Sequence, residues 1–154
     1  MKLRAVATAI GVAASVVLIA GSPAHAQAGP KQRYDHKDPY KAGCASTSRV
    51  VETAKLKSPM REEWGTVSLM WSRKCQTNWI KVKTSAKVTG TINLYTQDRR
   101  SDSFSFKKGN RGVHWGDMLW ANDMCAWGSV TVQQNGGRGG QYATGSTGMD
   151  AACN

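Results

Sequence analysis

Two stretches, Trp64-Gly65-Thr66-Val67-Ser68-Leu69-Met70-Trp71 and Asn78-Trp79-Ile80-Lys81-Val82-Lys83-Thr84, decide the fold of this chain. In both, apolar residues recur at every second position. The positions that share an apolar face are Val67, Leu69 and Trp71 in the first stretch and Ile80 and Val82 in the second. A period of two is typical of a β-strand with one buried face and one face in water. We therefore expect two strands here.

The same alternation continues along the chain in four further stretches: residues 87–96, 101–107, 125–132 and 141–146. Glycine-bearing turns separate several of these runs, at Lys108-Gly109-Asn110 and across residues 135–140. Short antiparallel strands of this kind usually roll into a barrel or sandwich, which hides their edges. The predicted fold is an all-β domain, a small antiparallel barrel or sandwich.

One short helix is expected at the start of the domain, within Cys44–Lys57. Apolar residues follow a spacing of three and four there, at Val50, Val51, Ala54 and Leu56, and Ser46 or Thr47 is placed to cap a helix. Pro59 would end it.

The first 26 residues have the layout of a secretory signal peptide. Lys2 and Arg4 precede an apolar run from Ala5 to Ala20, and Ala24-His25-Ala26 places small residues at both required positions of a cleavage site. The run is shorter than the roughly 20 residues that a membrane-spanning helix needs. We expect residues 1–26 to be removed and the chain to be secreted into the extracellular medium, with no membrane partner.

The remaining sequence divides into two parts. Residues 27–41 are polar and basic, and contain Pro30 and the turn signal Asp38-Pro39, so they predict a flexible N-terminal arm. Residues 42–154 are long enough for a single β domain.

Four cysteines lie in the exported part: Cys44, Cys75, Cys125 and Cys153. An even number in a secreted chain indicates two disulfides. Of the three possible pairings we favour Cys44–Cys75 and Cys125–Cys153, because each closes a loop of about 30 residues and ties a poorly structured segment to a strand. Since there is no Cys-x-x-Cys pair and no Cys/His cluster, we expect no metal and no cofactor.

The sequence of 154 residues carries 21 Lys and Arg against 10 Asp and Glu, a formal net charge of +11. This excess favours anionic partners, such as cell-wall polymers. The basic residues are scattered, so a generally basic surface is expected rather than a specific polyanion site. We expect no nucleic-acid partner, because an exported protein meets little nucleic acid.

Nothing in the sequence selects a catalytic set, and no enzymatic activity is expected. There is no Gly-x-Ser-x-Gly motif, His36 lies in the predicted arm, and no spacing singles out a pair of carboxylates. The six tryptophans offer contact surface instead. We interpret Trp71, Trp79 and Trp115 as core residues, and Trp120 and Trp127 as exposed binding residues.

Two segments carry a family resemblance: Asp38-Pro39-Tyr40-Lys41-Ala42-Gly43-Cys44 and Val67-Ser68-Leu69-Met70-Trp71-Ser72-Arg73-Lys74-Cys75-Gln76-Thr77-Asn78-Trp79. They resemble the small secreted YjfA-like proteins of Gram-positive bacteria, common in actinobacteria. Ala126-Trp127-Gly128-Ser129-Val130 is similar to the closing strand of that family. Met70 and Trp71 depart from its usual Arg and Tyr, and the pair Cys125 and Cys153 is not a shared feature of the family.

The resemblance implies a small β domain, a Cys44–Cys75 bridge and no catalytic residues. Some members are similar to the adaptor subunit of secreted umbrella-shaped toxin particles, which joins a lectin-like subunit to a repeat-containing scaffold. By that analogy, Arg33, Tyr34 and Tyr40 of the arm would anchor a partner.

We therefore expect a secreted, non-enzymatic adaptor that bridges protein subunits of an extracellular complex, such as an antibacterial toxin complex. The alternative is a stand-alone binder of anionic cell-wall polymers or carbohydrate.

Overall fold

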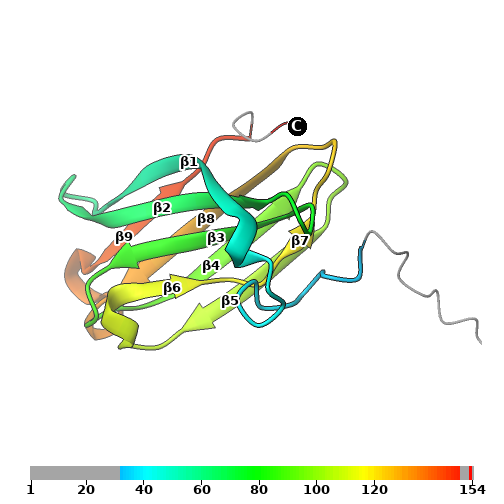
Figure 1. Ribbon diagram of the computed structural model, residues 1–154. Helices are drawn as coiled ribbons and strands as arrows, with labels where there is room; N and C mark the ends of the chain where they lie inside the picture. Colours follow the sequence, from blue (N-terminus) through cyan, green and yellow to red (C-terminus); the bar gives the residue numbers. More distant parts are fainter. Residues whose placement is uncertain (1–31, 150–152, 154) are drawn as a thin grey trace, which may run out of the picture.

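The structure is a computed structural model that describes residues 32–149 and residue 153. The expected signal peptide and residues 27–31 of the expected arm lie outside the described residues. Figure 1 shows a molecule built almost entirely from strands, which are β1 (Ser48–Lys57), β2 (Glu63–Ser72), β3 (Thr77–Thr84), β4 (Thr89–Thr96), β5 (Ser101–Phe106), β6 (Val113–Trp115), β7 (Leu119–Trp120), β8 (Ala126–Gln133) and β9 (Tyr142–Ser146).

All the strands belong to one antiparallel sheet, which rolls into a nearly closed, flattened barrel (Figure 1). Hydrogen-bonded neighbours follow the order β5-β4-β8-β9-β1-β2-β3-β6, and β7 also pairs with β3. The layer β1-β2-β3-β6 lies over the layer β5-β4-β8-β9, and β3 faces β4 and β8 across the interior. The layers join at one side through a single residue pair between β1 and β9, Lys57 and Thr144. On the other side β5 and β6 face each other without pairing.

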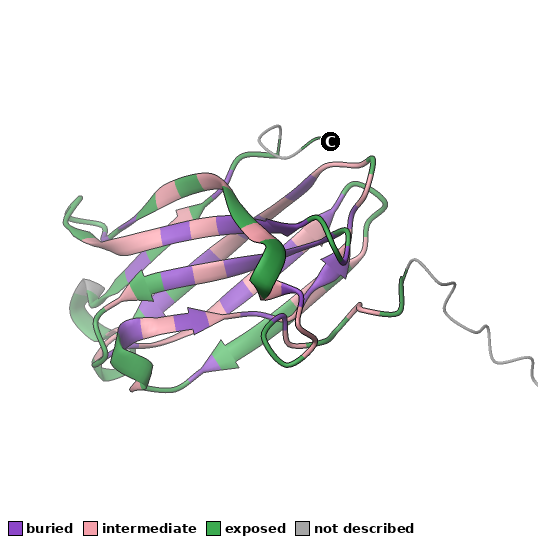
Figure 2. Ribbon diagram, in the orientation of Figure 1, coloured by how far each residue is buried: buried purple, intermediate pink, exposed green. Residues whose placement is uncertain are grey.

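The main core lies between the two layers, where the inward side chains of alternate positions meet. Figure 2 shows buried and less buried residues alternating along the strands. The residues of this core are Leu56, Val67, Leu69, Ile80, Val82, Val88, Ile92, Leu94, Phe106, Leu119, Val130, Val132 and Ala143. The all-β prediction is confirmed, because the alternating stretches of the sequence became β2, β3, β4, β5, β8 and β9.

The predicted N-terminal helix is wrong. A short 3-10 turn at Ala45–Thr47 leads directly into β1, and Ser48–Lys57 is a strand of ten residues. β-Branched side chains at Val50, Val51 and Thr53 suit a strand better than a helix, and β1 pairs with β2 from Ser48 to Lys57 with two register shifts.

The two layers approach closely at Gly128 of β8. A Cβ atom at this position would lie 2.3 Å from Cγ1 of Ile80 and 2.6 Å from the carbonyl oxygen of Asn93. Only glycine fits there without moving the backbone or β3.

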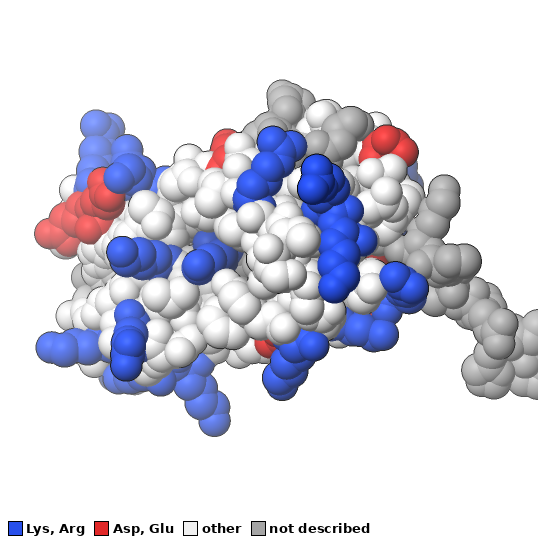
Figure 3. Space-filling view, in the orientation of Figure 1, with Lys and Arg blue, Asp and Glu red and all other residues white. Residues whose placement is uncertain are grey.

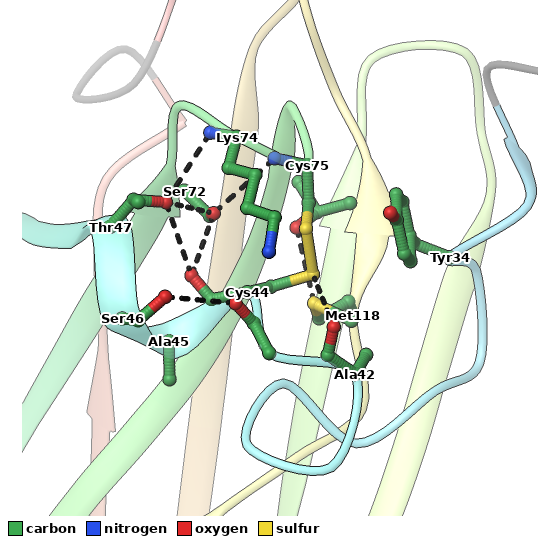
Figure 4. The surroundings of a disulfide bond; sticks show 12 residues. Tyr34, Ala42, Cys44, Ala45, Ser46, Thr47, Ser72, Lys74, Cys75 and Met118 are labelled. Atoms are coloured by element: carbon green, nitrogen blue, oxygen red, sulfur yellow. Dashed lines mark hydrogen bonds between the residues drawn. A yellow bond between two sulfur atoms is a disulfide. The ribbon is translucent and has the colours of Figure 1, made fainter.

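Both disulfides are formed with the predicted pairing, Cys44–Cys75 and Cys125–Cys153. The first lies in a second cluster, on the outer face of β2 and β3, which we call the disulfide cluster (Figure 4). Its buried members are Cys44, Met70, Cys75, Trp79 and Met118, with Tyr34, Ala42, Ala45 and Trp115 packed against them. Two disulfides are typical of a protein that folds in an oxidising environment.

Residues 32–41, which we call the docked segment, are the described part of the predicted arm, and they do not extend freely into solvent. The amide of His36 donates to the carbonyl of Met118 (2.8 Å), and the amide of Met118 donates to the carbonyl of Lys37 (3.0 Å). Tyr34 packs on the disulfide cluster. The expectation of a flexible arm is thus corrected for this part, because its polar groups bind the domain and its tyrosine adds apolar contact.

No helix in the described part of the chain is long and apolar enough to cross a membrane.

Candidate binding cleft at the open edge of the barrel

The edge strand β5 offers backbone groups that no neighbouring strand uses. It pairs with β4 along Ser101–Phe106, and among the described residues no strand pairs with its other side. β6, across the opening, pairs with β3 alone. An unpaired strand edge is a ready template for an additional extended segment.

The docked segment bridges one end of this opening. Asp35 accepts hydrogen bonds from the backbone N–H of Trp120 (2.6 Å) and from the guanidinium of Arg100, just before β5. Arg100 also donates to the carbonyl of Trp120 and to Asp98. His36 pairs with Asp102 of β5. The segment therefore ties β7 to the start of β5.

A ring stack closes the other end of the opening. The imidazole of His114 in β6 lies parallel to the ring of Phe106 in β5, with centroids 4.0 Å apart and planes inclined by 14°. His114 is only 7% exposed. The opening is thus limited to the middle of β5, where Phe104 lies.

Phe104 lines two adjoining hollows between these closures, and its 38% exposure marks it as an unusually accessible aromatic residue. The larger hollow, about 580 Å³, is formed with Lys37, Asp38, Lys41, Ala42 and Asp117. The smaller, about 130 Å³, is formed with Asp38, Asn110, His114 and Trp115. Together they form what we call the cleft. Its size is within the range of sites that hold small ligands or short peptide segments.

The carboxylates around the cleft have different environments. Burial opposes the ionisation of Asp38, but hydrogen bonds from the amides of Lys41 and Tyr40 and from the indole of Trp115 outweigh it and lower the pKa of Asp38. Burial raises the pKa of Asp117, and the nearby carboxylates of Asp102 and Asp38 raise it further. Asp38 is therefore fixed as an acceptor that holds Trp115, whereas Asp117 resists ionisation.

Most of the titratable groups around the cleft are engaged in contacts within the fold. Asp35, Asp38 and Asp102 are all occupied by hydrogen bonds within the fold. Burial lowers the pKa of His114, although a hydrogen bond that the ring donates to the backbone of Gly109 acts against this, and the ring is stacked on Phe106. Within the described residues, no group of three or more His, Cys, Asp and Glu side chains is placed to hold a metal ion.

The predicted partner-binding residues are not brought together. Arg33 stacks its guanidinium over the ring of Tyr34, which packs on the disulfide cluster. Tyr40 is 44% exposed, and its ring lies 4.4 Å from that of Trp115 at the rim of the cleft. Trp120 is half-buried beside the docked segment. Trp127 is half-buried on the outer face of the other layer, stacked on Tyr95.

Sequence reasoning missed Phe104, Asp38 and Asp117 as cleft residues. Phe104 falls on the apolar face of an alternating strand, which predicts burial. It is exposed because β5 is an edge strand, and strand order cannot be read from alternation. The sequence did contain a local indication for Asp38. In an Asp-Pro turn the carboxylate can accept hydrogen bonds from the following amides, and Asp38 accepts from those of Tyr40 and Lys41.

Fold and cleft together define a small disulfide-linked antiparallel β domain with an open edge. A family model described as "Protein of unknown function (DUF2690)" matches residues 32–126, well over half of the chain. The chain therefore belongs to the DUF2690 family. The matched region begins at Gln32, so it includes the docked segment and Cys44–Cys75, and it ends before most of β8 and before Cys153. No curated protein matches the chain, and no solved structure matches it either.

Proposed function

We propose that this protein is a secreted, non-enzymatic adaptor, whose cleft binds a short extended segment of a secreted protein partner. The observation that carries the proposal is the free outer edge of β5 with Phe104 exposed at its centre. A segment lying along this edge could form main-chain hydrogen bonds with β5 and insert a side chain against Phe104, which is how proteins add a strand to an exposed sheet edge.

A protein partner fits the cleft better than a small substrate does. Aromatic side chains from two elements, Phe104 of β5 and Trp115 of β6, line the cleft. Aromatic side chains are enriched at the centre of protein interfaces. The larger hollow is also lined by Lys37 and Lys41 and by the carboxylates of Asp38 and Asp117. The two lysines would pair with acidic side chains of a bound segment.

The alternative, a binder of anionic wall polymers, rests on the basic side chains spread over the layer β1-β2-β3-β6 (Figure 3). Pelleting with isolated cell walls that is reversed by salt would favour this alternative over the adaptor role.

The proposal is tested by placing a photo-crosslinking phenylalanine analogue at Phe104 in the secreting organism. The matched control places the same analogue at Val50, an apolar residue that is 54% exposed on β1, away from the cleft. We expect a discrete adduct with a secreted protein from position 104 and none from position 50. Phe104→Ala should also weaken co-elution of the native protein with larger secreted chains.

Elution as a monomer under gentle conditions, with no protein adduct from position 104, would refute the adaptor role. Equal adducts from both positions would show that capture is not specific to the cleft.

A further inference from the structure

The outward positions of strands β5, β4, β8 and β9 hold no charged side chain, although the protein is strongly basic. We call the outer face of these strands the hydroxyl face. Its outward positions, all exposed or half-exposed, are Ser101, Ser103 and Ser105 of β5, Thr89, Thr91, Asn93 and Tyr95 of β4, Trp127, Ser129, Thr131 and Gln133 of β8, and Tyr142, Thr144 and Ser146 of β9.

The strand register aligns these residues in rows across the sheet. Thr91 lies opposite Ser105 on one side and Thr131 on the other, and Thr131 lies opposite Thr144. A second row runs from Ser103 through Asn93 and Ser129 to Ser146. The intervening positions, such as Ile92 and Val130, point into the main core. Because strands lie about 4.8 Å apart and alternate residues about 7 Å apart, the rows form a regular array of hydroxyl groups.

The opposite layer has the reverse character. Lys55 of β1 and Lys83 of β3 both align with Thr66 of β2, and Lys81 aligns with Ser68 one row away. Figure 3 shows Lys and Arg spread over this side of the molecule. The lack of charge on the hydroxyl face is therefore a local property and does not follow from overall composition.

Aromatic rings lie in the two rows that flank these hydroxyl rows, one toward each end of the strands. Tyr95 and Trp127 are cross-strand neighbours with stacked rings, 6.0 Å between centroids. Tyr142 of β9, which is 41% exposed, lies opposite Gln133 in the flanking row on the other side. On the side of Tyr142, a hollow of about 300 Å³ is lined by Thr89, Thr91, Ser105, Thr131 and Gln133, and also by Lys107, which directly follows β5.

We propose that the hydroxyl face is a binding site for a neutral polysaccharide. Sugar rings present apolar C–H faces, which pack on aromatic rings, and hydroxyl groups, which exchange hydrogen bonds with Ser, Thr, Asn and Gln side chains directly or through water. The face supplies both kinds of group and extends over four strands, so it suits a chain of sugars rather than a single one.

Other occupants fit this face less well. A polyanion would need Lys or Arg along the rows to neutralise its charge, and the rows meet basic side chains only at their borders, at Lys57 opposite Thr144 and at Lys107 after β5. Another β-sheet packed on this layer would need the aliphatic side chains that fill such interfaces, and the outward positions hold none. The surface is thus uncharged, rich in hydroxyl groups and bordered by aromatic rings, as a neutral glycan requires.

The test is retention of the purified, oxidised protein on four uncharged polysaccharides: cellulose, chitin, the β-1,3-glucan curdlan and starch. Thr131→Glu places a charge at the centre of the hydroxyl face. Thr53→Glu is the matched control, because Thr53 is an exposed strand threonine on the opposite layer. We expect the protein to bind at least one of the four, with about tenfold weaker binding for Thr131→Glu and unchanged binding for Thr53→Glu.

Two further measurements distinguish binding at the hydroxyl face from binding at the basic layer or in the cleft. Retention should persist at high salt, because no ion pairs are involved, and it should persist in Phe104→Ala, because the cleft is a different site. Failure of the protein to bind any of the four polysaccharides would overturn the proposal, as would equal weakening by Thr131→Glu and Thr53→Glu. If Phe104→Ala alone abolished polysaccharide binding, the glycan site would be the cleft and the proposal for the hydroxyl face would be wrong.

Discussion

His114 is held in an environment that favours its neutral form. Its ring is stacked on Phe106 and only 7% exposed, and among the described residues its Nε2 has no hydrogen-bond partner. Burial lowers its pKa from the ordinary 6.5, against the opposing effect of a hydrogen bond that the ring donates to the backbone of Gly109. A proton on this ring would be a charge in a largely dry contact between β5 and β6.

The folded protein should therefore lose stability as the pH falls below about 6.5. In that range the unfolded chain binds a proton at His114 that the folded chain does not, so the free energy of unfolding decreases by at most about 1.4 kcal/mol per pH unit. Urea denaturation at about pH 7.5 and about pH 5 measures this decline. His114→Phe, which keeps a ring beside Phe106, should flatten it.

The other groups with shifted pKa values do not explain a loss of stability between about pH 7.5 and about pH 5 that is smaller in His114→Phe. Asp38 and Asp98 have lowered pKa values, so their contributions are lost only as the pH falls below 3.8. The pKa of Asp117 is raised, so its protonation adds stability as the pH falls. Asp117 is present both in the unmodified protein and in His114→Phe, so it cannot cause a difference between them. An equally steep decline in His114→Phe would show that His114 is not the sensitive group.

At the scale of single residues, the sequence predicted the burial of Trp79 but not its cause. Alternation placed Trp79 on the face opposite Ile80 and Val82, and the structure confirms that placement, since Trp79 pairs with Met70 on the outer face of β2 and β3. Its exposure is nevertheless 0%. The cover comes from the disulfide cluster and the docked segment, and a period-two pattern carries no information about such distant contacts.

At the scale of elements, clean alternation made β2, β3, β4, β5, β8 and β9 predictable to within about two residues. β1 was not, because the register between β1 and β2 shifts around Val51. This bulge shifts the alternation by one residue and produces the three-and-four spacing that predicted a helix. β6 and β7 have three and two residues, too few to show any period.

The docked segment is the element whose attachment can be tested most directly. Asp35 is the acceptor for both Arg100 and the backbone N–H of Trp120. Asp35→Ala should destabilise the protein by about 2–3 kcal/mol, because the partly buried guanidinium loses a charged acceptor. It should also speed hydrogen exchange at the amide of His36, which bonds to Met118.

Asp98→Ala is the matched control for this variant. It removes a second carboxylate from the same guanidinium, but Asp98 is more exposed and makes no contact with the docked segment. The expected cost is about 1 kcal/mol or less, with unchanged exchange at His36. Equal exchange rates in the two variants would mean that Asp35 does not hold the segment in place.

At the scale of the whole molecule, the sequence predicted the fold class and the disulfides but not how the strands are arranged in space. It predicted an all-β domain, two disulfides and their pairing, because these depend on local pattern and loop length. It could not predict the cleft or the separation of basic and hydroxyl faces. Both follow from strand order, which leaves β5 at an edge and aligns residues from four separate strands.

The two disulfides also differ at this scale, although they close loops of similar length, 31 and 28 residues. Loop closure alone would make each worth about 3–4 kcal/mol. Cys44 and Cys75 are 0% and 4% exposed and hold the docked segment against Trp79 and Met118. Cys125 is half-buried and Cys153 is exposed, and this bridge ties the C-terminal end to the start of β8.

Mild reduction should therefore open Cys125–Cys153 first, because a thiolate must reach a sulfur atom to attack it. Alkylation followed by mass spectrometry identifies the thiols that appear. The double variant Cys44→Ala/Cys75→Ala should lose more stability than Cys125→Ala/Cys153→Ala, by about 1–3 kcal/mol, since it also leaves a cavity in the disulfide cluster. Simultaneous labelling of all four cysteines, with equal losses of stability, would show that the disulfide cluster adds nothing beyond loop closure.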